Sequence, residues 1–370
     1  MTNSIAHPKT LLPQQDNAYE HMKLLPNGAK VQTDRRINLV TNFICFDLEG
    51  PLSPQDNAFE LMKRLPNGDN IFKVISRYDD LLTLKKREDY EPGDTLALIM
   101  PFLLRANISQ EDMKIASSKA TLIDGAKEFI SELRLRGWWV GDITTCYQDY
   151  GYPITTRAGI PWENVACTRY PSLDYYRQII SKDELAMVEH LESQIVALQP
   201  YKDDEKILER LDLFFNKEAT GTVLGKIIKD VHPMGGRRKA KQLREFAKKY
   251  RFQLNQGLVV GDSITDSKML EAVNKKGGVA VAFNANEYAL RYANVGLAST
   301  NLGDLRLVTQ AWEIGGKEAV EKAVRAQEKE EGTGNRNHFH WLSGRKNMDV
   351  VIQIHDRIRR LVRKEAGELG

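Results

Sequence analysis

The feature that most constrains this chain is an alternation of short apolar runs with amphipathic segments. Each run is nearly continuous in apolar residues, as expected for strands that are buried on both faces. The runs are 42–46, 138–143, 164–167, 257–260 and 279–283. Strands that alternate with helices in this way form a parallel sheet with helices on both faces. The sequence therefore predicts an α/β fold of the Rossmann-like kind.

Two long helical segments interrupt this alternation. One follows the first strand at 56–120, and the other follows the third strand at 174–230. In the second segment apolar residues recur at intervals of three and four, which is typical of a helix with one buried face. We therefore expect a core made of 41–55, 121–173 and 231–304, with a helical cap at 56–120 and a helical insertion at 174–230.

Two further segments flank this core. Residues 1–40 form an extension in which positions 15–28 repeat positions 55–68 with three substitutions in fourteen residues. The first copy lacks the strand that precedes the second, so we expect the extension to be dispensable for catalysis. Residues 305–370 are predicted to form a helical tail, with a loop after the charged run at 328–331.

The last helix of this tail combines one apolar face with several arginines. Its apolar face is predicted from the spacing of Val351, Ile354, Ile358, Leu361 and Val362. The rest of the helix carries Arg357, Arg359, Arg360 and Arg363. An arginine-rich face of this kind is usually solvated, so we expect these side chains to face water and predict no nucleic-acid partner from them.

The charge balance and the cysteines narrow the class of protein. The 53 Lys and Arg against 50 Asp and Glu leave a net charge of +3, which gives no argument for nucleic acid. No apolar stretch is long enough to span a bilayer, and the amino terminus lacks a secretory pattern. Cys45, Cys146 and Cys167 lack metal-ligand spacing and are interpreted as small buried residues. We expect a cytoplasmic protein.

The first strand runs into Asp47, Glu49 and Gly50. The carboxyl edge of a parallel sheet is where open α/β folds bind ligands. Positions i and i+2 of an extended segment point the same way, so Asp47 and Glu49 can address one substrate, as nucleophile and proton donor. Gly50 allows a sharp turn and a close approach of the backbone to a phosphate. An aspartate that merely caps a loop is the alternative.

A second buried strand ends in Asp262, with Asp266 four residues later. These two carboxylates, close to Asp47, would form an oxygen-ligand site that suits Mg²⁺. The alternative is a helix-capping aspartate followed by a surface aspartate.

Two further motifs offer groups that bind phosphate. The strand at 138–143 leads to Thr144 and Thr145, whose hydroxyls could hydrogen-bond a phosphate oxygen. A Gly-Gly turn precedes a basic helix in which Lys239 could supply positive charge to a phosphoryl group. Each motif alone is commonplace.

Taken together and in this order, the four motifs resemble the haloacid dehalogenase superfamily, and within it the phosphoserine phosphatase-like members. The segments TLIDGAKEFISELRLRG and GGVAVAFNANEYALRYANVGLAS are also similar to that family. The resemblance covers most of 42–300 apart from the two insertions. It implies a phosphatase of small phosphomonoesters.

The resemblance implies a role for each motif residue. Asp47 would become an aspartyl-phosphate, and Glu49 would protonate the leaving group and then activate water. Thr144 would bind the phosphate, with Thr145 as the alternative, and Lys239 would hold the phosphate and the nucleophile.

The resemblance also implies a metal site. Mg²⁺ would be held by Asp47, by the backbone carbonyl of Glu49 and by Asp262. Asp266 would support this set of ligands.

The chain departs from the family pattern at two positions. Glu49 stands where aspartate is usual, and Pro51 stands where threonine is common. The DLEG variant occurs among phosphoserine phosphatases and homoserine phosphotransferases, and in an archaeal group named energy-converting hydrogenase A subunit R, which this chain resembles in length and inserted helices. Phosphotransfer to an alcohol therefore stays open. So does a weakly active or non-catalytic subunit, or a homo-oligomer, that docks through 174–230 and the last helix.

Two smaller features have competing interpretations. Asp56 falls where similar enzymes place an acid that reads a substrate amine, but its repeat at Asp16 favours a structural role. His338 and His340 lack a third ligand, so packing or surface positions are preferred to a metal site.

Overall fold

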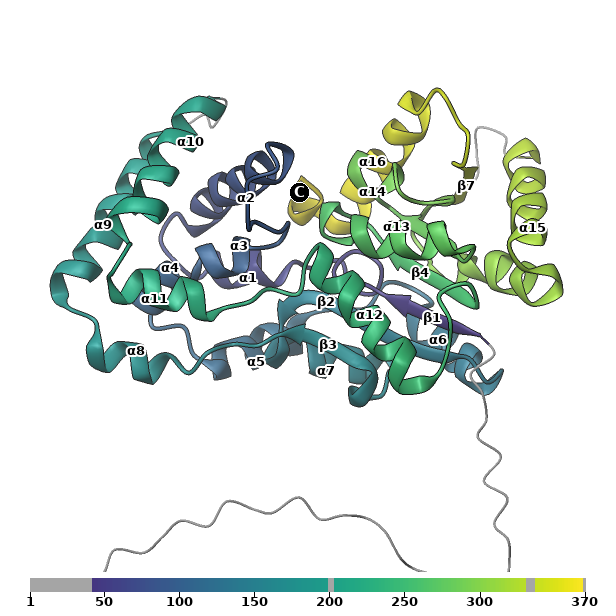
Figure 1. The fold of residues 1–370 in the computed structure, drawn as a ribbon, viewed down its shortest axis with the longest axis horizontal. Helices are drawn as coiled ribbons and strands as arrows, with labels where there is room; N and C mark the ends of the chain where they lie inside the picture. The colour runs from purple at the N-terminus through teal and green to yellow at the C-terminus, as the bar shows by residue number, and fades with distance from the viewer. Residues whose placement is uncertain (1–41, 199–202, 331–336, 369–370) are drawn as a thin grey trace, which may run out of the picture. The chain divides into compact units, whose positions relative to one another are not determined.

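The computed structural model describes residues 42–198, 203–330 and 337–368. Its centre is a seven-stranded sheet in the order β3-β2-β1-β4-β5-β6-β7 (Figure 1). The strands are β1 (Phe43–Phe46), β2 (Trp139–Tyr147), β3 (Val165–Thr168), β4 (Gly257–Gly261), β5 (Val279–Phe283), β6 (Val295–Ser299) and β7 (Asn337–Trp341). Neighbouring strands are parallel except for β7, which pairs antiparallel with β6. The α/β fold predicted from the sequence is confirmed.

Helices cover both faces of this sheet, as the apolar strands require. The α-helices are α1 (Asn57–Met62), α2 (Gly68–Leu84), α3 (Thr95–Leu98), α4 (Met100–Arg105), α5 (Gln110–Lys119), α6 (Ala126–Leu135), α7 (Gln148–Ala158), α8 (Leu173–Ile179), α9 (Lys182–Ala197), α10 (Asp204–Leu213), α11 (Val223–Asp230), α12 (Arg237–Tyr250), α13 (Ser267–Lys276), α14 (Glu287–Leu290), α15 (Arg306–Glu330) and α16 (Asp349–Arg363). Side chains of α6, α7 and α15 pack on one face of the sheet. Those of α12, α13, α14 and α16 pack on the other.

The cap and the insertion that the sequence separates share one hydrophobic core. Apolar side chains from α1 to α4 and from α8 to α11 form a single buried cluster. Helices α9 and α10 lie beside α2, as Figure 1 shows to the left of the sheet. The two insertions therefore build one helical layer, because each leaves an apolar helix face that the other covers.

The C-terminal region differs from the helical tail predicted at 305–370. It contains strand β7, which the sequence analysis missed, and the antiparallel pairing with β6 extends the sheet at its edge. Helix α15 is kinked at Gly315 and Gly316, where the backbone leaves helical geometry. His338 and His340 lie on β7 and are buried in packing.

The face predicted for the last helix was also wrong in part. Leu361 is 64% exposed, whereas Arg359 and Arg363 are 3% and 7% exposed. The buried stripe of α16 runs instead through Val351, His355, Ile358, Arg359 and Arg363. Two arginines thus point into the protein, which requires buried partners for their charge.

The extension at 1–40, with the first copy of the repeat, lies outside the described residues. Among the helices that the structure describes, none combines the length and the apolar character that crossing a membrane requires. The three cysteines are free, and Cys45 and Cys146 are buried as predicted, whereas Cys167 is half-buried.

Candidate active site

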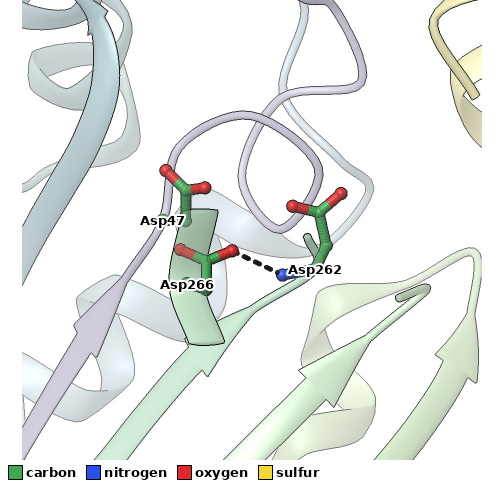
Figure 2. A group of neighbouring side chains, drawn as sticks. All are labelled: Asp47, Asp262 and Asp266. Atoms are coloured by element: carbon green, nitrogen blue, oxygen red, sulfur yellow. Dashed lines mark hydrogen bonds between the residues drawn. The ribbon is translucent and has the colours of Figure 1, made fainter. Parts of the chain in front are cut away.

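The carboxyl ends of β1 and β4 bring three aspartates together. Asp47 follows β1, Asp262 follows β4, and Asp266 lies in the short 3₁₀ turn Ile264–Asp266 behind it. Figure 2 shows the three side chains converging above the strand ends. One carboxylate oxygen from each lies within 4.8 Å of the others, and all three residues are buried. The predicted juxtaposition of these acids is therefore present in the fold.

Lys239 joins two of these carboxylates. Its Nζ lies 2.8 Å from Asp47 Oδ2 and 2.7 Å from Asp266 Oδ1, and the side chain is completely buried. Burial lowers the pKa of Lys239, but the Asp266 and Asp47 carboxylates outweigh this effect and raise it. Burial and the neighbouring Asp266 carboxylate raise the pKa of Asp47 to about 8, against the opposing charge of Lys239.

Asp266 organises the loop that follows β4. Its Oδ2 accepts hydrogen bonds from the backbone N–H groups of Asp262 (2.9 Å) and Ser263 (3.1 Å), while Oδ1 contacts Lys239. Both oxygens of Asp266 are thus engaged by protein groups. This is the arrangement of a supporting residue rather than of a direct metal ligand.

The side chain of Asp262 has one carboxylate oxygen that accepts no hydrogen bond from the described residues. Its Oδ1 is buried and has no hydrogen-bond partner among the described residues. A buried carboxylate oxygen without a partner is costly unless a cation satisfies it. Together with the nearby Asp47 carboxylate it offers the hard oxygen ligands that Mg²⁺ prefers, so the residues fit a divalent cation.

Gly50 is required by the packing of the loop after β1. Its φ is +107°, and a Cβ there would lie 2.3 Å from Asp262 Oδ2. A side chain at this position would therefore displace the Asp262 carboxylate. The glycine predicted to approach a phosphate also makes room for the acidic cluster.

Glu49 belongs to the same loop that follows β1. Its Oε1 accepts a hydrogen bond from the backbone N–H of Asn57, at the start of α1. Burial and the nearby Asp56 carboxylate raise the pKa of Glu49 well above its ordinary value. A carboxyl group whose pKa is raised in this way holds its proton more firmly and can donate it to a leaving group.

Asp56 caps α1 and faces the site at the same time. Its Oδ1 accepts a hydrogen bond of 2.8 Å from the N–H of Phe59, which confirms the structural role favoured by the sequence. Asp56 also lines the cavity above Asp47.

Thr144 and Thr145 follow one another near the carboxyl end of β2. Phe46 pairs with Asp142 in the sheet, so the next positions, Asp47 and Ile143, share the opposite face. Beyond Ile143 the strand does not alternate regularly, because its register with β3 shifts between Ile143 and Tyr147. Thr145 lines the cavity with Asp47, whereas Thr144 is completely buried and is not among the described lining residues. The predicted Thr144, whose Oγ1 accepts a hydrogen bond of 3.3 Å from the N–H of Cys146, and its alternative Thr145 both stay candidates for binding phosphate.

Sequence reasoning missed two residues of the site, Arg359 and Arg363 of α16. Arg363 Nη1 donates a hydrogen bond of 2.7 Å to Asp262 Oδ2, and Arg359 Nη1 donates to the same oxygen. Both guanidiniums line a cavity of about 90 Å³ with Asp47 and Glu49. Their i, i+4 spacing shows that they share a helix face, but nothing in the sequence distinguishes them from Arg357 and Arg360 on the same helix.

Comparisons with known proteins identify the family to which the chain belongs. The family model described as haloacid dehalogenase-like hydrolase matches residues 124–303. A gene product of known structure from Archaeoglobus fulgidus is 30% identical, with a TM-score of 0.75, and the match covers 89% of this chain and 98% of that one. The chain therefore belongs to the haloacid dehalogenase-like hydrolases, and the family and the enzyme class predicted from the motifs are confirmed.

More distant matches are phosphoserine phosphatases. One solved as an analogue of its phospho-aspartyl intermediate is 19% identical, with a TM-score of 0.46, covering 71% of this chain and 96% of that one. A substrate-bound phosphoserine phosphatase is 18% identical, with the same TM-score, covering 71% and 95%. These likenesses carry no argument about the substrate. A search of curated proteins found no match.

Proposed function

We propose that this hydrolase is a Mg²⁺-dependent phosphatase that cleaves a small phosphomonoester through an aspartyl-phosphate on Asp47. The observation that carries the proposal is the position of Asp47. This carboxylate contacts the buried ammonium of Lys239 and lies close to Asp262 and Asp266, in a cavity that Glu49 also lines. A nucleophile, a proton donor and a cation site thus surround one small space.

The chemistry proceeds in two displacements at phosphorus. A carboxylate oxygen of Asp47 bonds to phosphorus while the bond to the leaving alcohol breaks, and Glu49 gives its proton to the leaving oxygen. Glu49 then accepts a proton from water, whose oxygen attacks phosphorus, releases inorganic phosphate and restores the Asp47 carboxylate. The raised pKa of Glu49 suits the first of these steps.

The remaining residues hold the phosphoryl group and its charge. Lys239 neutralises the oxygens nearest to Asp47, and the Thr145 hydroxyl supplies a hydrogen bond from the end of β2. Mg²⁺ held by Asp47 and Asp262, with Asp266 in support, would neutralise the charge that develops on the phosphoryl oxygens.

The location and the partners inferred from the sequence stay proposals. They are the cytoplasm, a small phosphorylated substrate, and a protein or self-association surface on the helical layer. The relation to the hydrogenase subunit group also stays a prediction.

The proposal is tested with a panel of phosphomonoesters, with and without Mg²⁺, comparing the wild type with Asp47→Asn. We expect Mg²⁺-dependent phosphate release that falls at least about a thousandfold in the variant, because the nucleophile is lost. Turnover that survives in Asp47→Asn, or no turnover of any ester, contradicts the proposal. An added alcohol that captures the phosphoryl group would identify the phosphotransferase alternative.

The two neighbouring threonines provide a matched pair of variants. Thr145→Val removes the hydroxyl that faces the cavity, and we expect kcat/KM to fall about tenfold or more. Thr144→Val removes a hydroxyl that lies outside the cavity and should leave kcat/KM within about threefold. The reverse order would favour Thr144 as the phosphate-binding residue.

A further inference from the structure

Helix α16 delivers two guanidiniums to a single carboxylate oxygen. Arg359 and Arg363 both donate to Asp262 Oδ2, and Arg363 Nε also donates to the backbone carbonyl of Pro54 at 3.3 Å. Pro54 belongs to the loop that follows Asp47. The C-terminal helix therefore closes one wall of the active site, although its arginines lie 97 and 101 residues from Asp262 in the sequence.

These two arginines are unusual in their surroundings. The carboxylates that line the cavity are Asp47, Glu49, Asp56, Asp79, Asp80 and Asp262. Among the described residues that line it, Arg359 and Arg363 are the only cations. A cavity with this excess of carboxylates repels a phosphate ester unless cations offset the charge, and planar guanidiniums match phosphate oxygens well.

The two carboxylate oxygens of Asp262 have different surroundings. Its Oδ2 accepts hydrogen bonds from both guanidiniums, while its Oδ1 is buried and has no partner among the described residues. A divalent cation bound by Asp262 would share that carboxylate with two positive charges a few ångströms away. Charges of one sign at such distances repel strongly inside a protein, so the arginines and the cation weaken each other's hold on Asp262.

We propose that Arg359 and Arg363 are phosphate-binding residues of this site, and that they compete with the divalent cation for Asp262. This inference rests on the proposed function, since it assigns further substrate-binding residues to the same site. Cation binding by Asp262 loosens the guanidiniums, which then engage the anionic oxygens of phosphate. The cation and the phosphate thus bind with positive coupling, and the C-terminal helix carries the coupling.

The proposal predicts opposite effects of one substitution on two ligands. Removing a guanidinium removes a competitor for Asp262 and leaves a buried carboxylate in need of a cation, so the affinity for the metal rises. It also removes a group that binds phosphate, so the affinity for phosphate falls. A residue that merely held Asp262 in position would weaken both ligands when it is removed.

The experiment uses the full chain and two probes, Mn²⁺ and inorganic phosphate. Binding of Mn²⁺ is measured by electron paramagnetic resonance, and binding of phosphate by calorimetry at saturating Mg²⁺. The variants are Arg359→Gln and Arg363→Gln. Arg360→Gln, which changes an exposed arginine of the same helix, is the matched control.

We expect Mn²⁺ to bind at least about tenfold more tightly in both variants than in the wild type. Phosphate should bind at least about tenfold more weakly in the same variants, and the control should match the wild type on both measurements. Mn²⁺ binding that weakens or stays unchanged overturns the competition. Phosphate binding that stays unchanged overturns the assignment of the arginines.

Two further outcomes are separated by design. If the wild type binds no Mn²⁺ in a saturable way, the proposed function fails before the inference is reached. If the glutamine variants do not fold, Arg363→Lys keeps the charge but loses the planar fork. That variant should still weaken phosphate binding, and unchanged phosphate affinity in it overturns the proposal.

Discussion

The active site contains two buried ion clusters whose compositions are opposite. In the Lys239 cluster, one ammonium lies between the carboxylates of Asp47 and Asp266, at 2.8 and 2.7 Å. In the Asp262 cluster, one carboxylate oxygen accepts from the guanidiniums of Arg359 and Arg363. The first cluster has one carboxylate in excess, and the second has one cation in excess.

This difference corresponds to the two ligands that a phosphatase must gather. A surplus carboxylate attracts a divalent cation, and a surplus guanidinium attracts a phosphate. The two clusters are joined by a hydrogen bond from the N–H of Asp262 to Oδ2 of Asp266. A substitution in one cluster is therefore expected to alter the stability of the other. Substitutions that break one cluster at a time therefore measure how far the two are independent.

The largest effect is expected for Lys239→Met. The substitution leaves two carboxylates facing each other without a cation in a completely buried position. We expect the free energy of unfolding to fall by about 3–5 kcal/mol, measured by chemical denaturation without added metal. Lys241→Met, at an exposed position of the same helix, is the control. A fall of less than about 1 kcal/mol would show that the first cluster is not held by its lysine.

A smaller effect is expected for Arg363→Gln, because Arg359 remains on Asp262. We expect a loss of about 1–3 kcal/mol in the free energy of unfolding. In an Asp262→Asn background the same change should leave stability unchanged or raise it, because it removes one of two guanidiniums that repel each other. A double-mutant cycle measured by denaturation should therefore give a coupling of at least about 1 kcal/mol. Additive effects would mean that Arg363 acts elsewhere, for example on the Pro54 carbonyl.

The smallest effect is expected for Asp80, which lies on α2 in the helical layer and interacts electrostatically with Arg359. Burial raises the pKa of Asp80 from 3.8 to about 6, against the charges of Arg77 and Arg359. Between these pH values the unfolded chain ionises Asp80 while the folded chain keeps it protonated, so stability falls as pH rises through this window.

Replacing Asp80 by Asn removes this loss. The free energy of unfolding of Asp80→Asn, relative to the wild type, should rise by about 1 kcal/mol or less from pH 4 to pH 6 and stay level above. Denaturation curves at several pH values measure it, with the exposed Asp89→Asn as control. A difference that does not change with pH would contradict the raised pKa.

Much of the sheet could be read from the sequence, because its strands are continuous apolar runs. All five predicted strands are present, with ends that differ by a few residues. Helix α6 ends shortly before Gly137, whose φ is +82°. Strands β6 and β7 were not predicted, and the sequence of β7, NHFHW, is short and carries two histidines among its five residues. It is a strand through its pairing with β6, which is a property of the tertiary structure.

The sequence by itself determined the residues that follow the strands. The carboxyl ends of parallel neighbours meet at one edge, so Asp47, Glu49, Asp262 and Asp266 were bound to converge once the strands were recognised. The choice between Thr144 and Thr145 depends on the local geometry of β2, whose register with β3 shifts between Ile143 and Tyr147.

Only the tertiary structure decided the partners of Asp262. Arg359 and Arg363 share a helix with arginines that face water, and helical spacing alone does not state which face meets the protein. Their burial follows from how α16 packs against the sheet, about a hundred residues along the chain from the carboxylate that they bind. Contacts between local motifs follow from the sheet's geometry, whereas a contact over this separation depends on the packing of the whole domain.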